Sequence, residues 1–253
     1  NGVLDANGFD LSIGGNFYKG APGAFSREAS TVVFVNSSYP SAIEGNTTFN
    51  NLSCSTQGKM ISFEAGAIQT IEGVFLIGGS SASKVNLRSM TEGVTWEINP
   101  VGSRSVNYVN VRDSRNISIE DISAGNSVNY GNNSGWIFTN HAVQVFAGPR
   151  GRVNTMEGTF YVDTSEGGSL TFFVSPESMS YYISDVRING VSTTDALMPG
   201  TKTFTISNIT GFNTFEASFV AFGEKIWKGG GSTHKWSDPL NWSGNTTPWA
   251  TDR

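Results

Sequence analysis

The first 146 residues consist of short runs of alternating apolar and polar side chains, separated by Gly, Asn and Ser. Alternation with a period of two predicts β-strands, and no stretch of a dozen residues places apolar side chains at helical spacing. The hairpin dipeptides Asn-Gly and Asp-Gly are rare between the runs, which disfavours a simple antiparallel meander. The pattern therefore predicts many short strands and almost no α-helix, with strands expected at 106–111 and 117–122, among others.

A weak internal repeat indicates how these strands are arranged. Segment 31–49 can be aligned with segment 59–75, which matches Phe34 with Phe63 and superposes two Ile-Glu-Gly triplets. Further strands follow at spacings of roughly 20 to 30 residues, as expected when each coil cannot bury its own apolar face and must stack on the next. The alternative is a β-sandwich in which the triplet recurs by chance.

We therefore expect an all-β chain in which residues 1–147 form a parallel β-solenoid, or β-helix. Stacked coils from residue 8 to about residue 125 should bury one apolar side of each strand. The side chains expected to point inward are Phe34, Ile43, Phe49, Phe63, Ile71 and Phe75.

The character of the sequence changes after a Gly/Pro-rich junction at residues 147–154. Longer alternating runs follow, with turn signals at 166–168, Asn189-Gly190 and Pro199-Gly200. About six or seven strands in this short a segment predict a small β-sandwich, which we place at residues 148–224. Its inward side chains should include Phe204, Ile206, Phe215 and Phe219.

Residues 225–253 form a Gly-rich tail with four tryptophans, Trp227, Trp236, Trp242 and Trp249. The pattern W-x-G-G-G, W-S-D-x-x-N-W-S-G resembles the opening of modules in large repetitive bacterial exoproteins, of the autotransporter-like and adhesin-like kind. The runs LDANGFDLSIGGNF and GNTTFNNLSC are similar to their solenoid coils, and the middle segment to their interposed Ig-like domains. The resemblance implies an extracellular or cell-surface location, an Ig-like sandwich, and a tail that opens a following module.

Composition excludes several classes of partner. The formal net charge is -5 and Lys and Arg are scattered, so nucleic acid is not an expected partner. No apolar run approaches the roughly 20 residues of a membrane-spanning helix. Cys54 is the single cysteine, so an internal disulfide is impossible and we expect a small buried hydrophobe.

Candidate chemistry is sparse. Arg112, Asp113 and Asp121, with Tyr130 and Trp136 close in sequence, could line a glycan groove, although Arg-Asp neighbours on a solenoid are more often solvated ion pairs. The two histidines lack companions at metal-ligand spacing. Residues 5–10 faintly resemble a Ca²⁺ loop but are explained better by turn formation. We expect no catalytic residues, no metal and no cofactor.

These observations predict a non-enzymatic structural or adhesive module. Its partners would be copies of itself or neighbouring modules of the same polypeptide, with surface glycans as an additional ligand class. The alternative is a carbohydrate-binding or polysaccharide-cleaving β-helix. The tryptophans either cap a solenoid end or stack on sugar rings. Because the tail carries Trp side chains without a coil to bury them, we expect it either to fold back onto the sandwich or to dock on the N-terminal coil of a second copy and build a head-to-tail filament, the second being favoured.

Overall fold

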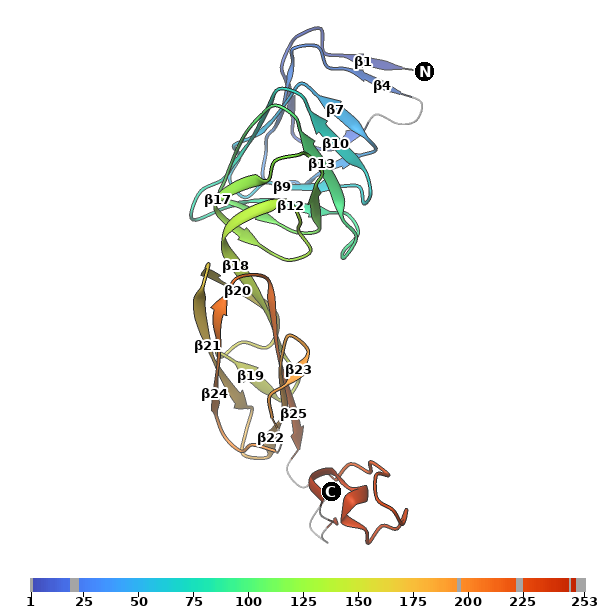
Figure 1. The fold of residues 1–253 in the computed structure, drawn as a ribbon, viewed down its shortest axis with the longest axis vertical. Helices are drawn as coiled ribbons and strands as arrows, with labels where there is room; N and C mark the ends of the chain where they lie inside the picture. The colour runs from blue at the N-terminus through green and yellow to red at the C-terminus, as the bar shows by residue number, and fades with distance from the viewer. Residues whose placement is uncertain (1, 19–22, 195–196, 222–224, 246, 249–253) are drawn as a thin grey trace. The chain divides into compact units, whose positions relative to one another are not determined.

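The computed structural model describes residues 2–18, 23–194, 197–221, 225–245 and 247–248 (Figure 1). The chain divides into two compact units, which are described separately. The first unit comprises Asn1–Ala142 with Thr210–Phe212, and the second comprises Val143–Ile209 with Asn213–Arg253. The described elements are β-strands and two short 3-10 turns, and no helix among them is long and apolar enough to cross a membrane.

The chain of the first unit forms three faces in turn. Most of its strands therefore pair in parallel with the strand three places earlier in the sequence. The first face contains β2 (Leu11–Ile13), β5 (Thr31–Phe34), β8 (Asn51–Cys54), β11 (Val74–Gly78), β14 (Ser103–Asn107) and the start of β17 (Ile122–Asn129). The second contains β3 (Phe17–Tyr18), β6 (Ser41–Glu44), β9 (Met60–Phe63), β12 (Val85–Ser89), β15 (Val109–Val111) and the end of β17. The third contains β7 (Thr47–Phe49), β10 (Ile68–Ile71), β13 (Trp96–Pro100) and β16 (Ser114–Asn116).

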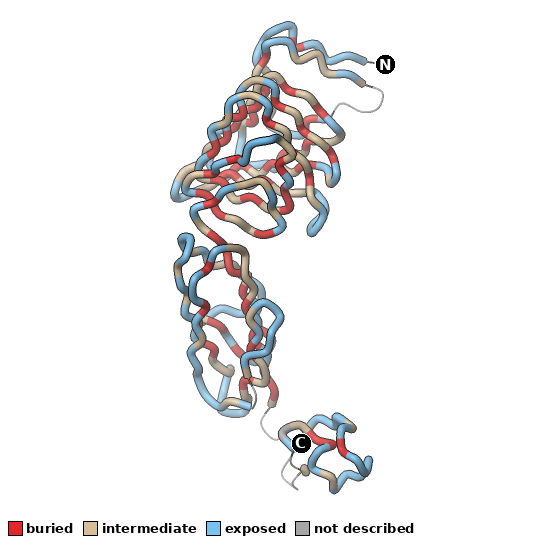
Figure 2. Tube along the Cα trace, viewed as in Figure 1, coloured by how far each residue is buried: buried red, intermediate tan, exposed pale blue. Residues whose placement is uncertain are grey.

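The register places like side chains directly above one another. Leu11 pairs with Val32, which pairs with Leu52, which pairs with Phe75. Apolar side chains of all three faces meet in one continuous core, and buried residues alternate with more exposed ones along many of the strands (Figure 2). The prediction of stacked parallel strands is confirmed, and the six side chains expected inside are all buried: Phe34, Ile43, Phe49, Phe63, Ile71 and Phe75.

The frame of the predicted repeat was nevertheless wrong. Phe34 lies on the first face and Phe63 on the second, where its lateral partner is Ile43. Ile71 lies on the third face and pairs with Phe49. Each coil repeats a similar unit of strand and corner three times, so the alignment superposed one face on the next rather than one coil on the next.

Two of the predicted strands are broken by corners. The run 106–111 divides at Tyr108, whose φ of 52° turns the chain from β14 into β15. The run 117–122 contains no strand before Ile122, because the side chain of Asn116 holds a turn there. Its Oδ1 accepts from the Ser118 N–H at 3.1 Å, and its Nδ2 donates to the Glu120 carbonyl at 2.8 Å. Alternation alone does not reveal such a corner.

At the N-terminal end of the described chain, β1 (Val3–Asp5) and β4 (Ala24–Ser26) form a separate two-stranded parallel sheet. Phe25 of β4 still reaches the core, where its ring lies 5.3 Å from that of Phe17 and 6.0 Å from that of Phe49. A cavity of about 480 Å³ lies between β4 and the neighbouring strands β7 and β10. The third face is therefore interrupted at this end.

The second unit begins within β18 (Trp136–Ala147), whose last residues, from Val143, pair in parallel with β25 (Asn213–Ala221). β25 also pairs antiparallel with β22 (Tyr181–Ile188), which pairs with β23 (Val191–Ser192), while β20 (Gly158–Ser165) pairs with β18. A separate sheet contains β19 (Gly151–Val153), β21 (Gly168–Pro176) and β24 (Lys202–Ile209). The two sheets share one apolar core, in which Phe172 and Phe215 stack at 4.4 Å.

The turns of this unit follow from its sequence. Asn189 and Gly190 both have positive φ, 52° and 78°, and they join β22 to β23 as an Asn-Gly pair does in a type I′ hairpin. Gly167, with φ of 71°, lies in the turn between β20 and β21. Of the side chains expected inside, Ile206 and Phe215 are buried, and Phe204 and Phe219 pack against the same core.

Candidate functional site

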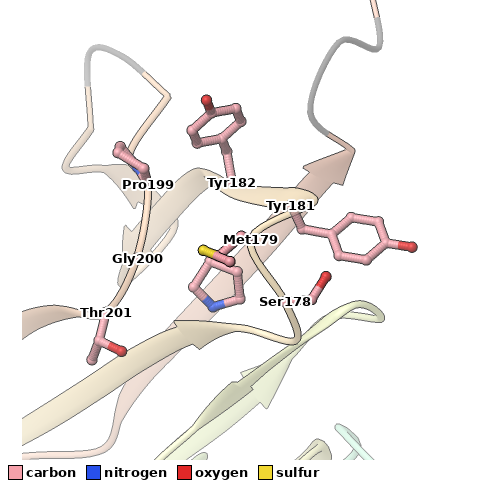
Figure 3. A pocket seen from close by; sticks show the side chains of 8 residues that line it. Ser178, Met179, Tyr181, Tyr182, Pro199, Gly200 and Thr201 are labelled. Atoms are coloured by element: carbon pink, nitrogen blue, oxygen red, sulfur yellow. The ribbon is translucent and has the colours of Figure 1, made fainter.

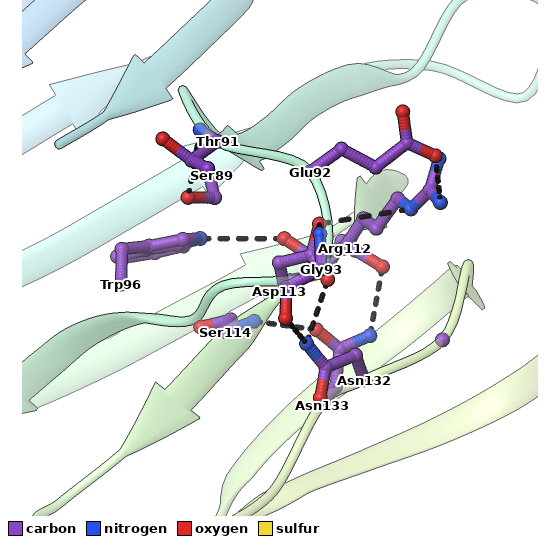
Figure 4. Close-up of polar contacts among 12 residues, drawn as sticks. Ser89, Thr91, Glu92, Gly93, Trp96, Arg112, Asp113, Ser114, Asn132 and Asn133 are labelled. Carbon is purple, nitrogen blue, oxygen red and sulfur yellow. Dashed lines mark hydrogen bonds and ion pairs between the residues drawn. The ribbon is translucent and has the colours of Figure 1, made fainter. Parts of the chain in front are cut away.

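The predicted glycan groove is divided between two corners of the coil. Asp113 lies at the corner between the second and third faces, with φ of 56° and only 3% of its surface exposed. Its Oδ2 accepts from the Gly93 N–H at 3.1 Å and its Oδ1 from the Asn132 Nδ2 at 2.7 Å (Figure 4). Gly93 and Asn132 belong to the coils on either side, so this carboxylate joins three coils.

Arg112 and Tyr130 lie at the same corner. The backbone N–H of Tyr130 donates to the carbonyl of Val111, which places the two residues on consecutive coils. The Arg112 guanidinium forms an ion pair with Glu92, and its Nε lies 3.7 Å from Asp113 Oδ2. The Arg88 guanidinium lies 5.8 Å from the centre of the Tyr130 ring, a cation–π distance.

Asp121 and Trp136 lie elsewhere. Asp121 is exposed at the corner that precedes β17, beyond the third face, and Trp136 pairs with Ile122 just after it. The Trp136 indole donates to Ser114 Oγ at 3.1 Å and stacks on Phe138 at 5.9 Å. The structure thus brings Arg112, Asp113 and Tyr130 together but leaves Asp121 and Trp136 at another corner.

A buried lysine, which sequence reasoning missed, makes the most extensive polar contact between coils. Lys59 is 0% exposed, and its Nζ donates to the carbonyls of Gly14 at 3.3 Å, Asn36 at 3.0 Å and Tyr39 at 2.8 Å. Burial lowers the pKa of Lys59, while the nearby Cys54 thiol partly opposes the shift. The signal was present in the sequence, because Lys59 has the same parity as the inward Ile61 and Phe63.

Cys54 is the small buried hydrophobe that we expected. Its side chain is fully buried in the coil core. Burial raises the pKa of the Cys54 thiol, so the reactive thiolate is disfavoured.

Further ion pairs join coils on the outside, the first between coils that are two apart and the other two between neighbouring coils. They are Arg27 with Glu72, Arg104 with Glu120, and Arg115 with Glu97. Exposed pairs of this kind contribute little individually, about 0 to 1 kcal/mol. They add to the hydrogen bonds that Lys59 and Asp113 form between coils.

The sandwich unit carries an open cavity of about 420 Å³ that the sequence did not predict. It lies between the loop that carries Met179 and the segment of Pro199 and Gly200 (Figure 3). The Arg150 guanidinium lies 5.5 Å from the Tyr181 ring centre. The lining is Pro176, Ser178, Met179, Tyr181, Tyr182, Pro199, Gly200 and Thr201, without a charged group among these residues.

Three tail tryptophans pack on one another instead of standing apart. The ring centres of Trp227 and Trp242 and those of Trp236 and Trp242 are 5.1 Å apart, and those of Trp227 and Trp236 are 5.9 Å apart. Trp242 is buried at 4% exposure, whereas Trp236 is 74% exposed. Trp249 lies outside the described residues. We call residues 226–243, which carry these three rings, the tryptophan knot.

Hydrogen bonds of polar side chains hold the tryptophan knot in its conformation. Asn241 is fully buried; its Oδ1 accepts from the Gly231 N–H at 2.7 Å and its Nδ2 donates to the Lys235 carbonyl at 3.0 Å. Asp238 accepts from Thr233 Oγ1 at 2.8 Å, and this hydrogen bond, with backbone N–H groups, lowers the pKa of Asp238. A Cβ on Gly231 would lie 2.5 Å from Asp238 Oδ2, so the third Gly of the G-G-G run cannot be replaced without a shift.

Within the described part of the chain, no group of three or more His, Cys, Asp or Glu side chains could hold a metal ion. No protein-family model matches the chain, and no curated protein and no solved structure is detectably similar to it.

Proposed function

We propose that this chain is a structural, non-catalytic module of an extracellular or cell-surface protein, in which the stacked coils act as a rigid spacer. The observation that carries this proposal is that Lys59 and Asp113 both form hydrogen bonds that join coils. Both are buried ionisable side chains, and each is fully engaged in hydrogen bonds between coils. A catalytic acid or base needs contact with substrate, which these positions do not offer.

The proposed location comes from the resemblance of the tail and coil motifs, and two features are compatible with it. The single cysteine lies buried in the core, so the fold does not depend on disulfide formation during export. Ser, Thr and Asn recur at the outward positions of the coil strands, as at Ser53, Ser62 and Asn86, which suits a surface in contact with water. For the second unit, the two facing sheets and the shared core support an Ig-like assignment, which belongs to the same proposal.

The non-catalytic role predicts no turnover of neutral or acidic polysaccharides, with or without Ca²⁺. The purified chain would be incubated with a panel of polysaccharides and reducing ends would be counted over time. The test variants are Asp113→Asn and the exposed Asp121→Asn, and circular dichroism checks that each still folds, because Asp113 also joins three coils. Turnover by the native chain that either variant abolishes while remaining folded would establish the alternative, a polysaccharide-cleaving β-helix.

Head-to-tail assembly into a filament stays a prediction. The expectation that the tail exposes all its tryptophans is modified by the tryptophan knot, in which Trp242 is buried and the rings cover one another. Trp236 is still open to an approaching partner. Deleting residues 226–253 should convert polymers to monomers in light scattering if the tail mediates the contact, and a monomer of unchanged state before and after deletion excludes the filament.

A further inference from the structure

Trp236 is the most exposed of the tryptophans that the structure describes, yet it is held firmly. The ring centres of Trp236 and Trp242 are 5.1 Å apart, with an angle of 63° between the ring planes. Those of Trp236 and Trp227 are 5.9 Å apart, with an angle of 33°. The Trp242 Nε1 donates to the Trp236 carbonyl at 2.8 Å, which also fixes the backbone beneath the ring. With 74% exposure, a broad part of the Trp236 ring remains open to solvent on a support that does not need to be ordered by a ligand.

The surroundings of the ring indicate what it would bind. Thr233, Lys235 and Ser237 are exposed neighbours in the chain, and the ionised Asp238 follows them. Thr233 and Asp238 bond each other, but the Lys235 ammonium and the Ser237 hydroxyl stay exposed on either side of Trp236 in the chain, and they suit a ligand that has an apolar ring face and many hydroxyl groups. A protein partner that buried Trp236 would also have to strip water from these polar groups, at a cost that needs matching hydrogen bonds.

A cationic ligand does not fit. An aromatic cage holds an ammonium group between separated rings, each within about 6 Å of the cation. Here the three ring centres lie only 5.1 to 5.9 Å from one another, so the rings touch and leave no space for a cation between them. Lys228 and Lys235 in the same segment would in addition repel a positive charge.

We propose that Trp236 is the stacking platform of a carbohydrate-binding site, which takes a pyranose ring of a neutral glycan on its open face, with the exposed side chains of Lys235 and Ser237, its neighbours in the chain, available to hydrogen-bond the sugar hydroxyls. This site goes beyond the structural role proposed above, which stands or falls independently of it. The role of the tryptophan knot is then to present one aromatic ring at a fixed orientation.

The experiment uses the full chain and soluble hexasaccharides of glucose, mannose and N-acetylglucosamine, with a uronic-acid hexasaccharide as the acidic comparison. Binding is measured by calorimetry and by the indole N–H signals in NMR spectra. We expect at least one neutral sugar to bind, Trp236→Ala to weaken binding about tenfold or more, and Trp236→Tyr to retain part of it, because stacking survives on a smaller ring. Leu240→Ala, which trims another exposed apolar side chain of the same segment, should leave binding unchanged.

The Trp242 indole N–H signal serves as the folding control, since its acceptor is the backbone carbonyl of residue 236 and remains in every variant. The proposal is overturned if no neutral sugar binds, if Trp236→Ala binds as well as the native chain, or if only the acidic sugar binds. It is also overturned if Trp236→Ala changes the particle mass of the protein without affecting sugars, because the ring would then serve a protein contact. If no sugar binds, the proposed spacer role still stands, because that role is tested separately by polysaccharide turnover.

Discussion

Replacing Phe63 by Ala should lower the free energy of unfolding of the coil unit by about 3 to 5 kcal/mol, as large-to-small changes in a packed core do. Phe63 is buried and stacks on Trp96, with ring centres 3.8 Å apart and an angle of 10° between the rings. The two rings come from different faces of the coil, so the truncation leaves a cavity in the middle of the core. Urea denaturation followed by circular dichroism measures the effect.

Leu76→Ala is the matched control for Phe63→Ala. Leu76 lies on β11 of the same unit but points outward and is 40% exposed, so its truncation should change stability by less than about 0.5 kcal/mol. Equal costs for the two variants would contradict the burial pattern of the coils. A second variant, Trp96→Ala, should combine with Phe63→Ala non-additively, because both remove the same ring contact.

The strands and their inward side chains could be predicted because side chains alternate along a strand with a period of two. In a coil, one side of each strand faces the core and the other faces solvent. The corners could not be predicted. Tyr108 and Asp113 adopt positive φ although neither is a glycine, and their conformations depend on hydrogen bonds from neighbouring coils. The repeat was aligned in the wrong frame for a different reason. The three faces of a coil have similar sequences, so the alignment has several equivalent solutions.

The candidate site was predictable only in part. Arg112, Asp113 and Tyr130 meet because they end or follow strands of the same face in consecutive coils. Asp121 lies beyond the turn that Asn116 holds, and local sequence proximity gave no warning of this turn. In the tail, the motif signalled a defined structure, but the packing of the tryptophans on one another required the buried amide of Asn241, whose contacts span ten residues.

Lys59→Met should lower the free energy of unfolding by about 3 kcal/mol, because Met fills a similar volume but leaves three buried carbonyls without their donor. Gly14, Asn36 and Tyr39 supply these carbonyls from two preceding coils, so the loss falls on the contacts between coils. Lys84→Met is the control: this lysine precedes the next strand of the same face and is partly exposed. It removes an equal charge and should change stability by less than about 0.5 kcal/mol.

The cost of Lys59→Met should also depend on pH in a defined direction. Burial lowers the pKa of Lys59 below its ordinary value of 10.5, so the folded chain binds fewer protons than the unfolded chain in the range between the two values. Stability therefore rises with pH in that range for the native chain and not for the variant, and the difference between them widens from neutral to alkaline pH. The amine formed at high pH still donates to carbonyls, which keeps part of the contact. Urea titrations of both chains at neutral and alkaline pH measure this difference in the free energy of unfolding. A difference that narrows with rising pH would show that the charge of the ammonium group, rather than the cost of burying it, dominates the contribution of Lys59 to stability.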